Sequence, residues 1–144
     1  MQKELRVAAY AVCTREGQVL LARLSGGSVA GHWTLPGGGM EHGEDPYDTV
    51  IREAEEETGY AVEPVTLLGV DSIRRRYPRK YGTYADFHAL RLVYEGRITG
   101  GTLRHEQHGS TNLAAWHDLA AVGELPTVGL VDAGLRLWRA TGGS

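Results

Sequence analysis

The segment from Gly43 to Tyr60, GEDPYDTVIREAEEETGY, carries the strongest helix signal in the chain and therefore constrains the fold most. Asp45 is a good N-cap, Pro46 suits the first helical position, and Gly59 is a natural C-terminal stop. Between these limits, apolar residues recur at helical spacing and predict a core-facing stripe of Tyr47, Val50, Ile51 and Ala54. The sequence therefore predicts an amphipathic helix that packs against another layer.

The same helix carries four glutamates in five positions. Glu53, Glu56 and Glu57 are three and four positions apart, so the helical period places them on one face, whereas Glu55 points elsewhere. Arg52 can contact Glu55 or Glu56. Like charges at this spacing cost about 0.2–0.5 kcal/mol per pair. The helix alone leaves two interpretations open: a solvated acidic surface, or a divalent cation held by the carboxylates. Oxygen ligands favour Mg²⁺, Mn²⁺ or Ca²⁺ over zinc.

The segment before the helix, residues 25–44, is predicted as a glycine-rich loop that contains PGGG at 36–39. Glycines let the backbone approach a metal or phosphate closely, which favours the cation interpretation. Seven identities at fixed spacing resemble the Nudix box, whose pattern is G, five residues, E, seven residues, then R-E-U-x-E-E-x-G-U, with U a bulky aliphatic residue. The matching residues are Gly38, Glu44, Arg52, Glu53, Glu56, Glu57 and Gly59. Ala54 and Tyr60 depart from the pattern at its two U positions, which are packing positions.

The resemblance implies an α/β Nudix fold, with a mixed β-sheet between helices, in a single domain over residues 1–144. It also implies a metal-dependent pyrophosphohydrolase, in which water attacks phosphorus in a nucleoside diphosphate linked to another group. A dinucleoside polyphosphate, ADP-ribose or a (d)NTP would be such a substrate. By family role, Glu53, Glu56 and Glu57 would ligate Mg²⁺ or Mn²⁺ or position the water, and the backbone carbonyl of Gly38 would join the metal shell. Arg52 would orient a box glutamate, and Glu44 would brace the loop–helix junction or join an outer metal site.

Members of the family often use a further acidic residue from a loop well after the box. The glycine-rich segment TGGTLRHEQHGST offers Glu106 as this catalytic residue, with Asp86 and Glu95 as rivals. An ordinary surface charge is the alternative interpretation of Glu106. The family's usual acidic residue before the late tryptophan is missing from TNLAAW, so the general base is not assigned.

Two further groups of residues are candidates for substrate binding. Arg23 follows an apolar strand and, by resemblance to the family, would contact phosphate. The segment RRRYPRKY holds five of the fifteen basic residues and is predicted as a loop at one end of a sheet. Arg75 and Arg76 there would guide a polyphosphate and Tyr77 would stack on a base, as in the dinucleoside polyphosphate group of the family. A solvated surface is the alternative for both groups.

The rest of the chain predicts alternating strands and helices. Residues 4–13 and 18–24 are expected to form a hairpin, and 32–35, 65–73, 84–96 and 111–119 are expected to be further strands. Residues 127–141 predict a closing helix. This mixture argues for a sheet covered by helices.

Composition limits the alternatives. A net charge of −3 over 144 residues gives no reason to expect DNA binding, and no apolar run is long enough for a membrane span or a signal peptide. The single cysteine, Cys13, excludes an internal disulfide and fits a cytoplasmic location. A small nucleotide is the expected partner, while an RNA 5′ end and a homodimer stay open. Two rival functions remain: a non-catalytic nucleotide-sensing module, and a pyrophosphohydrolase that acts on 5′-capped RNA.

Overall fold

The computed structural model describes residues 2–143. The strands are β1 (Gln2–Val12), β2 (Thr14–Arg15), β3 (Gln18–Leu24), β4 (Trp33–Thr34), β5 (Gly37–Gly39), β6 (Tyr60–Pro78), β7 (Tyr84–Gly101) and β8 (Thr111–Asp118). The helices are α1 (Pro46–Thr58) and α2 (Gly129–Ala140), with short 3-10 turns at Gly27–Val29, Lys80–Gly82 and Leu119–Glu124. In this part of the chain no helix is long and apolar enough to cross a membrane.

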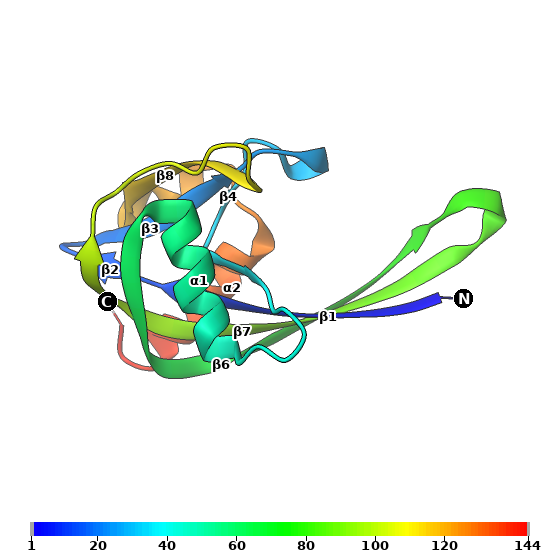
Figure 1. The fold of residues 1–144 in the computed structure, drawn as a ribbon, viewed down its shortest axis with the longest axis horizontal. Helices are drawn as coiled ribbons and strands as arrows, with labels where there is room; N and C mark the ends of the chain where they lie inside the picture. Colours follow the sequence, from blue (N-terminus) through cyan, green and yellow to red (C-terminus); the bar gives the residue numbers. More distant parts are fainter. Residues whose placement is uncertain (1, 144) are drawn as a thin grey trace.

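The strands form two sheets rather than one (Figure 1). The first has the order β5-β1-β7-β6 and is mixed, because β1 runs parallel to β7 and the other pairs are antiparallel. The second joins β2, β3 and β4, with β8 paired to β3. The predicted hairpin of 4–13 with 18–24 is therefore wrong: only Thr14–Arg15 pairs with Gln18–Val19, and the chain then passes from the first sheet into the second.

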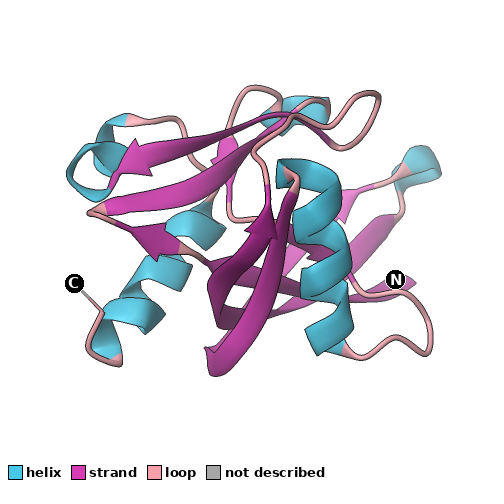
Figure 2. Ribbon diagram, turned by 60° about the vertical axis from the view of Figure 1, so that its left-hand side comes forward, coloured by secondary structure: helices cyan, strands magenta, loops and turns pink. Residues whose placement is uncertain are grey.

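Alternation along β1 explains why helices cover both faces of the strands (Figure 2). Ala8, Tyr10 and Val12 pack in the core cluster that contains α2 residues such as Leu130 and Trp138. The intervening residues Ala9, Ala11 and Cys13 pack in a second cluster with Val50 and Ala54 of α1. The predicted arrangement, strands between helices, is confirmed. Burial raises the pKa of the Cys13 thiol to about 12, so this cysteine serves packing.

The ends of α1 agree with the sequence analysis, and its buried face partly disagrees. Asp45 caps the helix by accepting a hydrogen bond from Tyr47 N–H, and Gly59 ends it in the left-handed conformation at φ 81°. Val50 and Ala54 are buried, but Tyr47 is 39% exposed, because the N-terminal turn extends beyond the sheet's core. Pro36–Gly39 is not simply a loop: Gly37–Gly39 forms β5, an edge strand paired with Ala8–Tyr10 of β1.

The outer ends of β1, β6 and β7 form a projecting arm, which we define as residues 2–7, 70–78 and 84–91 (Figure 1). The register pairs Pro78 with Tyr84, so β6 continues through Arg74–Pro78 of the basic segment that was predicted as a loop, and only its end, from Arg79 to Tyr81, lies in a turn. Cross-strand ion pairs explain the difference, since the Arg74 guanidinium donates to both carboxylate oxygens of Asp86 at 2.9 and 2.6 Å. Only the turn around Tyr81, which has φ 62°, interrupts the two strands.

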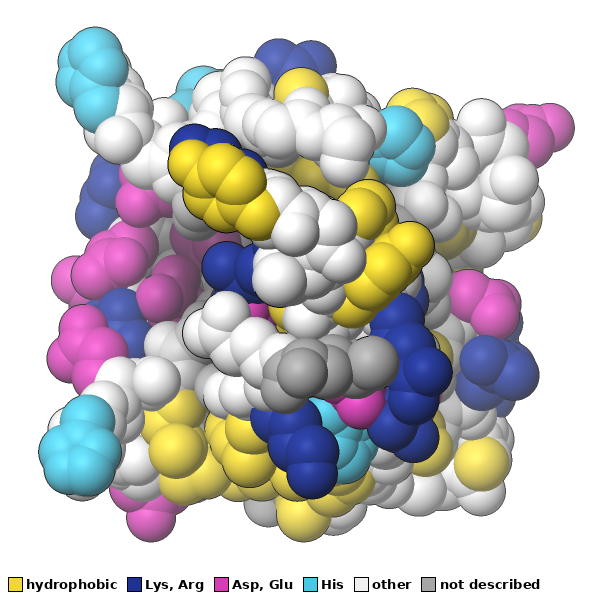
Figure 3. Space-filling view, turned by 90° about the vertical axis from the view of Figure 1, so that its right-hand side faces the viewer, with side chains coloured by type: hydrophobic (Ala, Val, Ile, Leu, Met, Phe, Trp, Pro, Cys, Tyr) yellow, Lys and Arg dark blue, Asp and Glu magenta, His cyan; other side chains and the backbone are white. Residues whose placement is uncertain are grey.

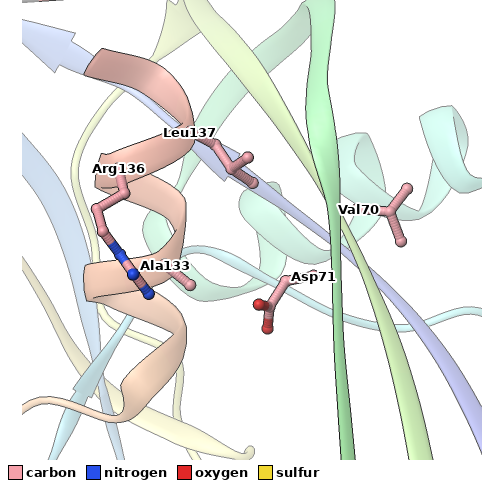
Figure 4. A pocket seen from close by; sticks show the side chains of 5 residues that line it. All are labelled: Val70, Asp71, Ala133, Arg136 and Leu137. Atoms are coloured by element: carbon pink, nitrogen blue, oxygen red, sulfur yellow. The ribbon is translucent and has the colours of Figure 1, made fainter. Parts of the chain in front are cut away.

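A small pocket of about 220 Å³ lies between β6 and α2 (Figure 4). Asp71 points toward the helix, where Ala133, Arg136 and Leu137 project, while Val70 points to the other side of the strand. Arg91 neutralises Asp71 through an ion pair. This pocket is therefore a packing feature whose buried charge is already paired.

Candidate functional site

The glycines of β5 bring its backbone against the acidic face of α1. A Cβ on Gly38 would lie 2.8 Å from the carboxylate carbon of Glu53, and a Cβ on Gly37 would collide with the backbone of Ala9, so glycine is required at Gly37 for this approach. Gly37 N–H donates a 2.9 Å hydrogen bond to Glu57 Oε1 in a buried position. The two box glutamates are thus held against the strand that the sequence analysis expected to approach a metal or phosphate.

Arg52 connects the helix to the preceding loop. Its Nε and Nη2 donate to the two oxygens of Glu44 at 2.9 Å each, and Nη1 donates to Glu53 at 2.8 Å. Nη2 also lies 3.3 Å from the backbone carbonyl oxygen of Gly39. Glu56 is more distant, at 3.9 Å, so the main partners of Arg52 are Glu44 and Glu53 rather than Glu55 or Glu56.

Glu44 occupies a fully hydrogen-bonded position at this junction. Besides Arg52, it accepts hydrogen bonds from Thr49 Oγ1 at 2.7 Å and from Glu41 N–H at 3.1 Å. The Arg52 hydrogen bonds, followed by those of Thr49 and Glu41, lower the pKa of Glu44 to about 2. The geometry agrees with a bracing role for Glu44, since its acceptor positions are already used.

Glu53 and Glu57 lie in surroundings that disfavour the charged form of their carboxylates. Glu57 is 2% exposed, and this burial raises its pKa well above the usual range. The hydrogen bond from Gly37 N–H opposes the increase, and repulsion from Glu53, Glu106 and Glu56 adds to it. Burial raises the pKa of Glu53 as well; Arg52 opposes this increase, whereas Glu56 and Glu106 add to it. Four carboxylates therefore share a region in which Arg52 is the nearby cation.

Glu106 belongs to this group although it lies far away in the sequence. It sits in the segment between β7 and β8, and its carboxylate accepts a 3.0 Å hydrogen bond from Thr111 Oγ1. Arg104, two residues earlier, donates through its N–H to the Thr58 carbonyl at the end of α1 at 2.9 Å, and repulsion from Glu106 contributes to the raised pKa of both Glu53 and Glu57. The rivals are engaged elsewhere: Asp86 pairs with Arg74 on the arm, and Glu95 accepts from Trp138 Nε1 at 3.1 Å. The position of Glu106 thus supports its candidacy.

The donor set fits a hard divalent cation, because it consists of carboxylates and nearby backbone carbonyls. The carboxylates also have too little positive charge around them. Within residues 2–143, however, no three acidic, histidine or cysteine side chains are arranged as a ready metal cage. The hydrogen bonds explain this, since Arg52 holds Glu53 and Gly37 N–H holds one oxygen of Glu57. Metal binding would require small side-chain rearrangements, most easily of Glu56, which is half exposed.

The predicted substrate residues lie in other places. Arg23 Nε donates to Asn112 Oδ1 at 3.0 Å, and its guanidinium lies 5.9 Å from the centre of the Trp33 ring. Asn112 adjoins Thr111, the partner of Glu106, so Arg23 borders the acidic region. No pattern in the sequence singled out Asn112, because the pairing of β3 with β8 brings it to Arg23.

On the arm, Arg75 and Tyr77 line a pocket of about 440 Å³ with Phe87, which pairs with Arg75 across the strands. Arg76 pairs with Asp86, and strand alternation directs it to the opposite face. The structure therefore groups Arg75 with Tyr77 and separates Arg76 from them. Figure 3 shows acidic side chains gathered at one side of the molecule and basic side chains on the projecting end. The sequence analysis missed Phe87, which only the strand register could have indicated.

Comparison with known proteins agrees with this geometry. A family model for the NUDIX domain matches residues 3–138. The chain is 33% identical over 87 residues to an 8-oxo-dGTP diphosphatase from Proteus vulgaris, an alignment that covers 60% of this chain and 76% of that protein. It is 33% identical to an ADP-ribose pyrophosphatase from Methanocaldococcus jannaschii and 34% identical to the human 8-oxo-dGDP phosphatase NUDT18, over 68% and 72% of this chain. The chain spans 54% and 29% of the length of these two relatives.

Solved structures show the same fold. A MutT NUDIX hydrolase from Burkholderia pseudomallei superposes with a TM-score of 0.71 and 26% identity, covering 93% of this chain and 98% of that one. The NUDIX domain of Shewanella oneidensis NrtR, solved with ADP ribose, superposes with a TM-score of 0.67 over 98% of this chain and 89% of that one. Its identity of 20% supports the fold alone.

Proposed function

Because this chain belongs to the Nudix family, whose hydrolases act on pyrophosphate bonds of nucleotides, we propose that it hydrolyses a nucleoside diphosphate linked to another group, with Mg²⁺ or Mn²⁺ as cofactor. The observation that carries the proposal is the set of four carboxylates, Glu53, Glu56, Glu57 and Glu106, around the glycine strand β5. A non-catalytic sensing module would have no need for such a costly accumulation of charge, so we favour the enzyme.

Each group has a distinct task in this mechanism. Glu53, Glu56 and Glu57, with the Gly38 carbonyl, would hold the cation, which when bound neutralises phosphate charge and lowers the pKa of water. Arg52 would orient Glu53 through its 2.8 Å hydrogen bond and limit how far this ligand turns when it binds the cation. Glu106, or whichever box carboxylate is left unliganded, would accept the proton of the attacking water. Attack at phosphorus then cleaves the anhydride and leaves the sugar C–O bond intact.

The arm favours one group of substrates among the nucleotides. Its pocket joins two aromatic rings, Tyr77 and Phe87, to the Arg75 guanidinium, which suits a base and an adjacent phosphate. We propose that dinucleoside polyphosphates use this pocket for their second base, with ADP-ribose and (d)NTPs as shorter substrates. The same basic surface would also accept the 5′ end of an RNA, which is the second candidate.

A substrate panel tests the function. Purified protein is incubated with a dinucleoside tetraphosphate, ADP-ribose, dGTP, 8-oxo-dGTP and a 5′-triphosphorylated RNA, each with Mg²⁺, with Mn²⁺ and with EDTA. Reactions in ¹⁸O water should place label on a phosphate product and should stop with EDTA. Label in a sugar hydroxyl, or equal turnover with EDTA, would contradict the mechanism. Competition by RNA against free nucleotide distinguishes the second candidate.

A further inference from the structure

The segment that carries Glu106 is fastened to the catalytic helix. We define residues 102–110, between β7 and β8, as the Glu106 loop. Arg104 N–H donates to the Thr58 carbonyl at 2.9 Å, and the Arg104 guanidinium donates to the Glu55 carbonyl at 3.2 Å. Both acceptors lie at the C-terminal end of α1, where a cation is favoured by the helix dipole, and the Glu55 carbonyl also accepts from the Gly59 N–H at 2.9 Å. Arg104 therefore caps the helix that carries the other three carboxylates.

The neighbouring residue fastens the same loop to the second sheet. His105 Nδ1 accepts a 3.2 Å hydrogen bond from Ala114 N–H of β8. Because Nδ1 is the acceptor, the neutral ring carries its proton on Nε2. Farther along, Ser25 Oγ donates to the Gly109 carbonyl at 2.7 Å and Ser25 N–H donates to the Ser110 carbonyl at 3.0 Å. The loop is thus held at both ends while Glu106 lies between the attachments.

Two glycines make this close packing feasible. Gly59 packs closely against Thr102 and Arg104, and a Cβ at Gly59 would collide with both. Gly109 leaves open the space that the Glu106 carboxylate occupies. The carboxylate is then in place to accept from the Thr111 hydroxyl at 3.0 Å and to lie within 3.4 Å of Thr111 N. These contacts define one position for Glu106 in relation to α1.

We propose that Arg104 and His105 are positioning residues that set the location of Glu106 opposite Glu53 and Glu57. Three successive residues have three different partners: Arg104 binds α1, His105 binds β8, and Glu106 accepts from Thr111. A shift of the loop by one residue, or its release, would move the carboxylate away from the reacting phosphate. This inference rests on the proposed function, and it assigns roles to two residues outside the Nudix box.

Kinetics of six variants test the proposal. His105→Ala and Arg104→Ala should each lower kcat by about 10- to 100-fold, because a displacement of about 1 Å has effects of this size, with KM nearly unchanged. His105→Asn should recover most of the activity, since its Oδ1 can replace Nδ1 as acceptor. Gln107→Ala, an exposed position in the same loop, is the control and should match the wild type. In a Glu106→Gln background, His105→Ala should cause no further loss, and an equal loss there would overturn the proposal.

Amide exchange gives a readout that is independent of turnover. In His105→Ala, the amides of Ala114 and Thr111 should both exchange faster, and His105→Asn should restore their protection. A rise at Ala114 with no change at Thr111 would show that Glu106 keeps its place without His105, and would overturn the proposal. If the wild type hydrolyses no nucleotide, the proposed function fails, and the Thr111 amide alone decides whether the attachment positions Glu106.

Discussion

The acidic region around α1 and the projecting arm are both dense in like charge, yet they neutralise it in opposite ways. On the arm, each strand faces opposite charges on its neighbour: Arg74 binds Asp86, and Arg79 binds Glu4. The Arg74 hydrogen bonds lower the pKa of Asp86. Around α1, Glu53, Glu57 and Glu106 repel one another and burial raises the pKa of the first two. The arm therefore pairs part of its charge internally, although its cations still outnumber its carboxylates, whereas the acidic region leaves charge for a cation from outside.

This difference shows that the density of like charge in a sequence does not by itself indicate function. Four glutamates in five positions and five cations in seven positions look equally unusual as sequence. Strand pairing supplied counter-charges to several cations, while helical geometry concentrated the glutamates at an edge strand of glycines. In this molecule, charged side chains that receive too little counter-charge from the fold are thus the ones that indicate function.

The largest effect should follow removal of one unpaired carboxylate. Glu57→Gln or Glu56→Gln should lower kcat by about 10²–10⁴-fold at saturating Mg²⁺, the range for loss of a charged catalytic group. The fold should survive, because Glu57→Gln removes a buried charge that is repelled by its neighbours. Steady-state kinetics and thermal melting of the purified variants measure both effects.

Glu55→Gln is the matched control for these variants. Its side chain is exposed on the same helix and lies outside the acidic face, so its activity should stay within about twofold of the wild type. Near-normal turnover in both Glu56→Gln and Glu57→Gln would remove the assignment of the metal site.

Breaking the brace between the loop and α1 should have the next largest effect. Arg52→Ala removes the paired hydrogen bonds to Glu44 and the contact with Glu53, so we expect kcat to fall by about 10- to 100-fold and the melting temperature to decrease. Arg52→Lys should recover little, because an ammonium group cannot reproduce the forked geometry. Full activity in the lysine variant would show that only charge matters at this position.

The predictable part of the site was local, and the unpredictable part depended on pairing between distant strands. Caps and spacing located α1 and its acidic face, because Asp45, Pro46 and Gly59 act within one or two turns. The nearness of Glu106 to Glu57 depends on a connection between β7 and β8 that no local pattern specifies. Local propensity also misled at Arg74–Pro78, where charges typical of a loop became strand residues through ion pairs across the arm, whereas Arg79 and Lys80 do lie in the turn.

A smaller effect concerns the free energy of unfolding, which should change with pH in a definite direction. The pKa of Glu57 is raised in the folded state, chiefly by burial, so the folded chain holds this proton more tightly than the unfolded chain. The free energy of unfolding should therefore fall as pH rises above the unfolded value of about 4.3 toward the raised pKa. Metal-free wild type should lose stability as the pH rises through this range, and Glu57→Gln should lose less.

Mg²⁺ should reverse this loss at pH 8. A cation at 100 times its Kd adds about 2.7 kcal/mol to the free energy of unfolding, provided that it does not bind the unfolded chain. Urea titrations at several pH values, with EDTA or with Mg²⁺, measure the effect. Parallel pH profiles for wild type and Glu57→Gln in EDTA would mean that this carboxyl is not strained, and the comparison of the two regions would lose its basis.

The smallest effect should come from the arm, where we expect lost affinity rather than lost chemistry. Arg75 and Tyr77 line one pocket with Phe87, and base–aromatic stacking contributes about 1–3 kcal/mol per base. Arg75→Ala or Tyr77→Ala should therefore raise KM for a dinucleoside tetraphosphate by about five- to tenfold, with kcat nearly constant, as expected when binding is lost equally in the ground state and the transition state. The increase for ADP-ribose should be smaller, and high salt should reduce the effect of Arg75→Ala.

Arg76→Ala is the matched control, since strand alternation turns Arg76 to the opposite face of the arm. If KM is unchanged for both substrates at low and high salt, or if Arg76→Ala has the same effect as Arg75→Ala, the pocket is a solvated surface, and the basic residues of the arm have no part in substrate binding.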